Sequence, residues 1–232
     1  MNAAVFVFHA SLNDLLATRQ RGQAIPLRFA EHQTVKHLIE SLGVPHVEVG
    51  EILVAGAPVG MEYRPQDGDR VEVRPHPPAC PDDARFLVDI HLGRLAAYLR
   101  MLGFDSLYPG GADDAALAAM LNEDARILLT RDRRLLMRKA IQRGYCLRSL
   151  IPEEQLHEVV ARYQLKELAR PFGRCMDCNG LLEPVSKAQI LDRLEALTKE
   201  YFEDFSRCPD CDKVYWKGSH HQRMEKLITR VM

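Results

Sequence analysis

Two short cysteine pairs in the last third of the chain constrain its fold more than any other feature. Both have C-x-x-C spacing, at which a tight turn lets two thiolates bind one tetrahedral ion. Asn179 and Asp212 follow the pairs, and these residue types tolerate the left-handed backbone that such turns favour. The pattern predicts a structural Zn²⁺ site; two redox pairs are the alternative, although these normally lie at a thioredoxin-like strand-helix junction. The four cysteines are Cys175, Cys178, Cys208 and Cys211.

Residues 166–232, which contain both pairs, are expected to form a zinc-ribbon module. The 29 residues between the pairs exceed the usual short ribbon spacing, so we expect an inserted helix in KAQILDRLEALTKEYF, residues 187–202. Tyr215, Trp216, Lys217 and the pair His220-His221 follow the second cysteine pair. These side chains either stack on nucleic-acid bases and hold phosphate, or pack against the ribbon and face solvent.

Composition and charge exclude some classes of function. The 232 residues carry a formal net charge of −1, so the molecule as a whole is not attracted to nucleic acid or to an anionic membrane, and any such binding is local. No apolar run reaches the roughly 18 residues that a membrane span needs, and the first residues lack the basic start of a secretory signal. We therefore expect a cytoplasmic protein that does not bind membranes, in which cysteines remain reduced and available for metal.

The first 75 residues show the pattern of a compact α+β domain. Two apolar strand segments precede a helix capped by Thr34, and two or three further strands follow. This order, with PQDGDRVEV near its end, resembles the ubiquitin-like sulfur-carrier family of thiamine and molybdopterin synthesis. Those carriers act through a free C-terminal Gly-Gly, whereas here the chain continues beyond Val73. A domain that docks a protein partner is therefore the expectation, and a sulfur-carrier accessory is the weaker alternative.

Residues 76–84 are Pro-rich and are expected to form a linker, and residues 85–165 alternate strands with helices. This alternation predicts βαβ units on a parallel sheet, with helices on both faces. The expected strands are 85–89, 105–109, 126–130 and 145–150, and the expected helices are 92–104, 113–125, 133–144 and 152–165. Gly103 is expected to close the first of these helices at its C′ position.

Two aspartates closely follow apolar strand segments in this α/β region. Asp89 comes directly after FLV, and Asp132 follows ILL with only Thr130 and Arg131 between them. Ligands of open parallel sheets bind beyond the carboxyl ends of the strands, so both acids and the helix start at Asp113-Asp114 are expected at one rim. Clustered carboxylates repel unless a cation is bound, which predicts Mg²⁺ or Mn²⁺, with the Thr130 hydroxyl orienting Asp132 or a phosphate. The alternative is that each acid is an ordinary cap or turn residue.

A run of basic residues surrounds Asp132. Such a run is either a solvated helix face or, beside an acidic site, a track that binds phosphate. The seven bases of this run are Arg131, Arg133, Arg134, Arg138, Lys139, Arg143 and Arg148.

The motifs D-x-x-L-G-R-L-A, L-R-M-L-G-F-D and L-L-T-R-D, followed by the two cysteine pairs, resemble the Mut7-C RNase domain of the PIN-like nuclease superfamily over about residues 85–225. The front third resembles the ubiquitin-like domain sometimes fused to it. The resemblance implies metal-dependent RNA cleavage by clustered acids at Asp89, Asp114 and Asp132. Arg94 and Arg100 match basic positions of the motif helix. Arg94 can contact phosphate, whereas Arg100 can equally pair with a surface acid. Arg134 stands where related proteins often have a further acid.

These observations predict a metal-dependent ribonuclease with a PIN-like α/β core, an N-terminal ubiquitin-like β-grasp domain and a C-terminal zinc ribbon that helps hold RNA. The expected phosphate contacts are Arg94, Arg131, Arg133 and Arg134. The alternative is a non-catalytic RNA-binding adaptor, which the arginine in place of a further acid favours.

Overall fold

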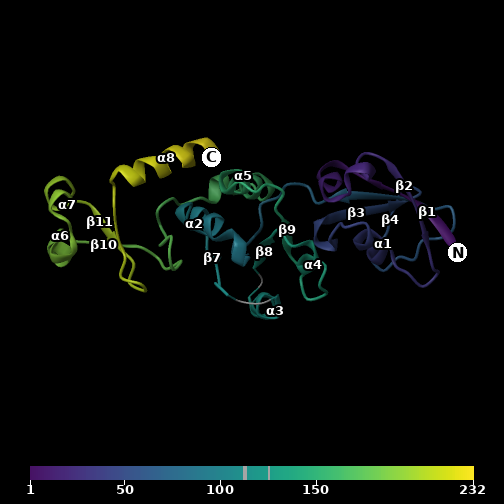
Figure 1. The fold of residues 1–232 in the computed structure, drawn as a ribbon, viewed down its shortest axis with the longest axis horizontal. Helices are drawn as coiled ribbons and strands as arrows, with labels where there is room; N and C mark the ends of the chain where they lie inside the picture. Colours follow the sequence, from purple (N-terminus) through teal and green to yellow (C-terminus); the bar gives the residue numbers. More distant parts are fainter. Residues whose placement is uncertain (112–113, 125) are drawn as a thin grey trace. The chain divides into compact units, whose positions relative to one another are not determined.

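The computed structural model describes residues 1–111, 114–124 and 126–232 (Figure 1). The chain divides into two compact units, one with residues 1–78 and 112–148 and the other with residues 79–111 and 149–232. Among the helices that are described, none is long and apolar enough to cross a membrane.

The N-terminal segment forms a five-stranded mixed sheet with one helix, as its hydrophobic pattern predicts. The strand order is β2-β1-β5-β3-β4, in which β1 and β5 are parallel and the other pairs are antiparallel. The Thr34 hydroxyl oxygen accepts from the His37 N–H at 3.4 Å and caps α1, which buries Val35, Leu38 and Ile39 beside the sheet (Figure 1). The elements are β1 (Asn2–Phe8), β2 (Ala24–Phe29), α1 (Val35–Ser41), β3 (Val49–Val54), β4 (Ala57–Pro58) and β5 (Arg70–Pro75).

The same unit contains the second half of the α/β segment. Strands β8 and β9 are parallel, and α4 packs against both. The predicted helix over 133–144 ends after one turn, since the chain leaves the helix after Met137 and the Ile141 side chain is fully buried. The elements are α3 (Asp114–Glu123), β8 (Ile127–Thr130), α4 (Arg133–Leu136) and β9 (Gly144–Cys146).

A buried ion pair joins Glu48, just before β3 of the β-grasp domain, to Arg148, just after β9, within this unit. Glu48 is 5% exposed, and its carboxylate accepts two bonds from Arg148 at 2.9 and 3.1 Å and one from the Cys146 N–H at 2.6 Å. Burial alone would lower the pKa of Arg148, but the hydrogen bond and charge of Glu48 raise it above its usual value. The ubiquitin-like domain is therefore packed onto the α/β segment by a desolvated, bidentate pair.

In the other unit, β6 and β7 are parallel, and α2 packs against both strands and against α5. The Phe86 ring on β6 meets Phe104 edge-on at 6.2 Å and lies 5.9 Å from the Tyr163 ring. The elements are β6 (Phe86–Val88), the 3₁₀ helix η4 (Ile90–Leu92), α2 (Gly93–Met101), β7 (Ser106–Leu107) and α5 (Pro152–Arg162).

The C-terminal module is a three-stranded antiparallel sheet followed by a long helix. The helix expected over 187–202 is broken into three short pieces, because Leu194 is extended and packs with Ile190 and Phe205 in a small core. This tertiary packing outweighs the helical periodicity of the segment. The elements are β10 (Glu183–Val185), α6 (Lys187–Ile190), η6 (Leu191–Arg193), α7 (Ala196–Tyr201), β11 (Phe205–Arg207), β12 (Val214–Trp216) and α8 (Ser219–Val231). The predicted fold class is confirmed: parallel strands flanked by helices, an N-terminal β-grasp domain and a C-terminal cysteine ribbon.

Gly103 ends α2 at the position that the sequence predicts for it. Its φ is +94°, and the carbonyls of Met101 and Leu102 accept bonds from the Phe172 and Arg170 N–H groups at 2.8 Å. A Cβ atom at Gly103 would lie 2.3 Å from the Arg170 carbonyl oxygen. Glycine is therefore required both by the left-handed backbone and by the close approach of the segment that leads into the ribbon.

We predict that Gly103→Ala destabilises the protein, by about 1–2 kcal/mol from left-handed strain and further from the backbone clash. Gly111→Ala is the matched control, since Gly111 has a φ of +85° and a Cβ there would meet no described atom within 4 Å. Chemical denaturation of both variants measures the difference. Equal losses of unfolding free energy would show that the Arg170 contact does not matter.

Candidate functional site

The four predicted cysteine ligands lie together. Their Sγ atoms are all within 4.8 Å of one another, with Cys175 and Cys211 at 3.5 Å and Cys178 and Cys208 at 3.3 Å. Zn–S bonds of about 2.3 Å in a tetrahedron place sulfur atoms about 3.8 Å apart. The cluster therefore fits one Zn²⁺ with four thiolates and no open position, which suits a structural role. Within the part of the chain that the structure describes, no other group of three or more such ligands is found.

Both cysteine pairs sit in the same backbone turn. The N–H of Asn179 bonds to the Cys175 carbonyl at 3.0 Å, and the N–H of Asp212 bonds to the Cys208 carbonyl at 2.8 Å. Asn179 and Asp212 have φ values of +78° and +61°, which confirms the left-handed residues expected after each pair. The repeated turn points each pair of thiols toward one ion.

Tyr215 supports the cluster through its hydroxyl group. The hydroxyl lies 3.1 Å from the Cys175 Sγ and accepts from the Met176 N–H at 3.2 Å. Burial opposes ionisation of Cys175, but hydrogen bonds from Tyr215 and from the backbone of Cys178 and Asp177 lower its pKa to about 7. Burial raises the pKa of Cys178 to about 12. The sequence left open whether this aromatic segment stacks on bases or packs against the ribbon, and nothing in it indicated the contact of Tyr215 with a thiol.

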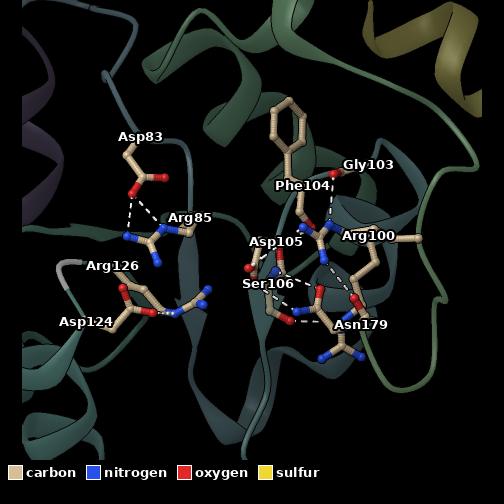
Figure 2. A network of polar contacts seen from close by, with 11 residues as sticks. Asp83, Arg85, Arg100, Gly103, Phe104, Asp105, Ser106, Asp124, Arg126 and Asn179 are labelled. Atoms are coloured by element: carbon tan, nitrogen blue, oxygen red, sulfur yellow. Dashed lines mark hydrogen bonds and ion pairs between the residues drawn. The ribbon is translucent and has the colours of Figure 1, made fainter. Parts of the chain in front are cut away.

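The first cysteine turn is held on α2 and β7 by polar side chains (Figure 2). Arg100 is 5% exposed and donates to the carbonyls of Ser106 at 2.8 Å, Met176 at 3.1 Å and Asp177 at 2.6 Å. Burial lowers the pKa of Arg100. The charge interactions with Cys175, Cys178, Asp105 and Asp177 raise the pKa and offset part of this shift.

The Asn179 side chain completes this network. Its amide oxygen accepts from the Ser106 N–H at 2.9 Å, and its amide group donates to Asp105 at 2.8 Å (Figure 2). The same residue thus supplies the left-handed backbone of the cysteine turn and the bonds that fix the turn to β7. The sequence indicated only the first of these roles.

Asp89 lies directly after β6 and begins η4. The residue is 8% exposed, and its carboxylate accepts from the Ile90 N–H at 2.6 Å. A buried carboxylate at the carboxyl end of a parallel strand is the position that the sequence predicts for this acid.

Asp132 lies two residues after β8 and caps α4. Its Oδ1 atom accepts from the N–H groups of Arg134 and Leu135 at 2.8 and 3.3 Å, and the side chain is exposed. The buried Thr130 hydroxyl oxygen accepts from the Asp132 N–H at 2.9 Å, so Thr130 orients the backbone of this acid. A helix cap and a metal ligand are compatible, because Oδ2 makes no hydrogen bond within the described residues.

Asp114 is the first residue of α3, and its side chain lies outside the described part of the structure, as does all of Asp113.

The predicted phosphate contacts differ in their surroundings. Arg94 is exposed on α2, and Arg131 and Arg134 are exposed beside Asp132 with no ion pair among the residues described. Arg133 donates to the Leu15 carbonyl of the β-grasp domain. These four arginines are therefore not equally available to a ligand. Together with Glu40, Ser41 and Gly43, residues 131–134 line a shallow hollow in their unit.

Comparison with protein families agrees with this architecture. A family model described as the Mut7-C RNAse domain matches residues 84–228, more than half of the chain, and one described as Mut7-C ubiquitin matches residues 1–80. The chain belongs to the Mut7-C family. No curated protein and no solved structure matches it.

The RNase family model of this Mut7-C protein extends across the cysteine ribbon and into α8. The ribbon is thus part of the Mut7-C RNAse domain in sequence as well as in packing. The family match suggests a nuclease-like activity on RNA, and the ubiquitin-like match suggests an interaction with another protein.

We predict that Cys208→Ala abolishes stoichiometric zinc binding by the Mut7-C protein and lowers its thermal stability, because a structural Zn²⁺ contributes on the order of 10 kcal/mol of coupled binding energy. Metal analysis of the purified chain and a melting curve measure both effects. Cys80→Ser is the control, since Cys80 is exposed and lies outside the cluster. Full zinc content in the Cys208 variant would contradict a four-thiolate site.

Proposed function

We propose that this protein is a metal-dependent ribonuclease that hydrolyses RNA phosphodiester bonds. The observation that carries the proposal is the match of residues 84–228 to the Mut7-C RNAse domain. In this proposal Asp89, Asp114 and Asp132 hold Mg²⁺ or Mn²⁺, cations that prefer carboxylate oxygens. Zn²⁺ in the cysteine cluster is structural.

The position of two acids supports this assignment. Asp89 and Asp132 each follow a parallel strand at its carboxyl end, where the ligands of such sheets bind. Asp89 is buried, which suits a carboxylate that keeps a fixed geometry, and Thr130 fixes the backbone at Asp132. When bound, the metal ion lowers the pKa of a water molecule and stabilises charge on the leaving oxygen.

Arginines beside these acids have the roles of binding and orienting the RNA backbone. Arg94, Arg131 and Arg134 are exposed and offer planar, charged donors that match phosphate oxygens. Arg133 has the same role in the proposal. One of its N–H groups donates to the Leu15 carbonyl, and the remaining N–H groups of the guanidinium can bind phosphate. The ubiquitin-like domain recruits a protein partner, and the protein acts in the cytoplasm.

A non-catalytic RNA-binding adaptor is the second candidate. Two observations favour it. Asp132 caps α4, which is an ordinary structural role, and Arg134, whose side chain makes no ion pair in the described residues, stands where related proteins often have a further acid. An adaptor binds RNA with an affinity that falls as salt rises and gives no metal-dependent product.

We predict that Asp132→Asn reduces Mn²⁺-dependent cleavage of single-stranded RNA by about a hundredfold or more, as expected when a metal ligand is lost. Asparagine is as good a helix cap as aspartate, so α4 is preserved. The assay compares product formation by wild type and variant with Mn²⁺ and with no added divalent ion.

Asp82→Asn is the matched control for that assay, because it removes one exposed carboxylate in the linker region. Equal cleavage by wild type and Asp132→Asn would refute the role of Asp132. Salt-dependent binding with no product from the wild type would favour the adaptor.

A further inference from the structure

A wide cleft lies within the unit of residues 79–111 and 149–232, and none of the proposed acids is among the described residues that line it. It has a volume of about 870 Å³, and its walls come from α2, from β12 of the ribbon and from α8. Helix α8 follows the ribbon in the chain and extends to α5, where Arg230 pairs with Glu153 at 2.8 Å (Figure 1).

Positive charge is in excess on the walls of this cleft. Five Lys or Arg residues and two carboxylates line it. Both carboxylates are already paired, Glu153 with Arg230 and Asp177 with Lys213. Three exposed basic residues remain with no ion pair in the described structure: Arg94, Arg223 and Lys226. In a chain of net charge −1, such a local excess indicates a polyanionic ligand.

The three unpaired basic residues come from two helices that line the cleft. On α8, Arg223 and Lys226 lie on the same side of the helix as the paired Arg230, at positions i, i+3 and i+7. Arg94 faces the same space from the first turn of α2. Opposing basic walls suit a flexible phosphate backbone that runs between them.

An exposed aromatic ring stands at the edge of the cleft. Trp216 on β12 is 40% exposed and lines both this cleft and a neighbouring cavity of about 400 Å³. Gly218 packs against the indole, since a Cβ there would lie 3.0 Å from the Trp216 Nε1. Beside it, the rings of Phe172 and His221 stack at 4.1 Å. A large, partly open ring beside unpaired cations is the combination on which an unstacked base can pack.

We propose that this cleft binds single-stranded RNA, with phosphates on Arg94, Arg223 and Lys226 and a base stacked on Trp216. The choice of RNA among polyanions rests on the proposed function. Single-stranded rather than duplex RNA follows from the ring, because only an unpaired base can leave its stack and lie on an indole. The cleft thus forms a holding site for substrate, and its described walls contain none of the acids proposed to cleave it.

We predict that the double variant R223Q/K226Q binds a fluorescein-labelled 12-nucleotide oligo(U) about tenfold more weakly at low salt. The slope of log affinity against log salt falls by about 1.4, from roughly 0.7 for each lost phosphate contact. Trp216→Ala weakens binding about tenfold without changing that slope, because stacking releases no counterions. Fluorescence anisotropy on the zinc-loaded full chain, with no added Mg²⁺ or Mn²⁺, measures both.

The double variant K166Q/K199Q is the matched control, since it removes the same charge from the same unit outside the cleft. Trp216→Phe keeps a ring and is expected to retain most of the affinity, and zinc content reports whether each ribbon variant is folded. Equal loss in the cleft and control doubles, equal affinity for duplex RNA, or equal competition by a poly-glutamate peptide would overturn the proposal.

Binding and cleavage are read separately, so the two proposals fail separately. Loss of RNA binding in the cleft variants of a protein that cleaves nothing supports the cleft and refutes the ribonuclease. Cleavage that depends on Asp132, with RNA binding unchanged in the cleft variants, refutes the cleft alone.

Discussion

The buried guanidinium of Arg100 is the contact on which the second unit depends. The side chain extends from α2, and its guanidinium donates to three carbonyls, one on β7 and two in the first cysteine turn. A buried cation is costly unless its donors are satisfied, and these carbonyls, together with the nearby thiols and acids, provide that compensation. Loss of any one of these bonds would leave a buried donor unsatisfied. The cysteine turn is therefore held in a fixed position relative to α2.

This coupling gives the zinc cluster a role beyond the ribbon. Asn179 holds β7 through Ser106 and Asp105, and the segment before the turn caps the end of α2 through the Arg170 and Phe172 N–H groups. Strand β6, which pairs with β7, leads directly into Asp89. A metal ion bound by the four cysteines would therefore stabilise the strand pair that leads into Asp89, and it would fix the cleft wall that contains Trp216.

Local chemistry in the sequence predicted much of this arrangement, and long-range contacts account for what it missed. Left-handed residues at Asn179 and Asp212 follow from C-x-x-C spacing, and the glycine at the end of α2 follows from helix capping. The sequence left Arg100 as a possible surface contact, because nothing local reveals that carbonyls 76 and 77 residues away surround it. Helical periodicity over 187–202 likewise predicted one helix, since it carries no information on the packing of Leu194.

Basic residues of the α/β segment divide between holding the fold and facing solvent, and charge alone did not separate them. Arg148 is used by the bidentate pair with Glu48, and Arg133 donates to the Leu15 carbonyl, so both connect the β-grasp domain to the α/β segment. Arg131 and Arg134 lie on either side of Asp132 with no such contact in the described residues. The ubiquitin-like domain therefore supports the loop that carries this acid, in addition to any partner that it binds. Two contacts fix the loop on which the proposed phosphate-binding arginines lie: the Thr130 hydroxyl accepts from the Asp132 N–H, and Arg133 donates to the Leu15 carbonyl of the β-grasp domain.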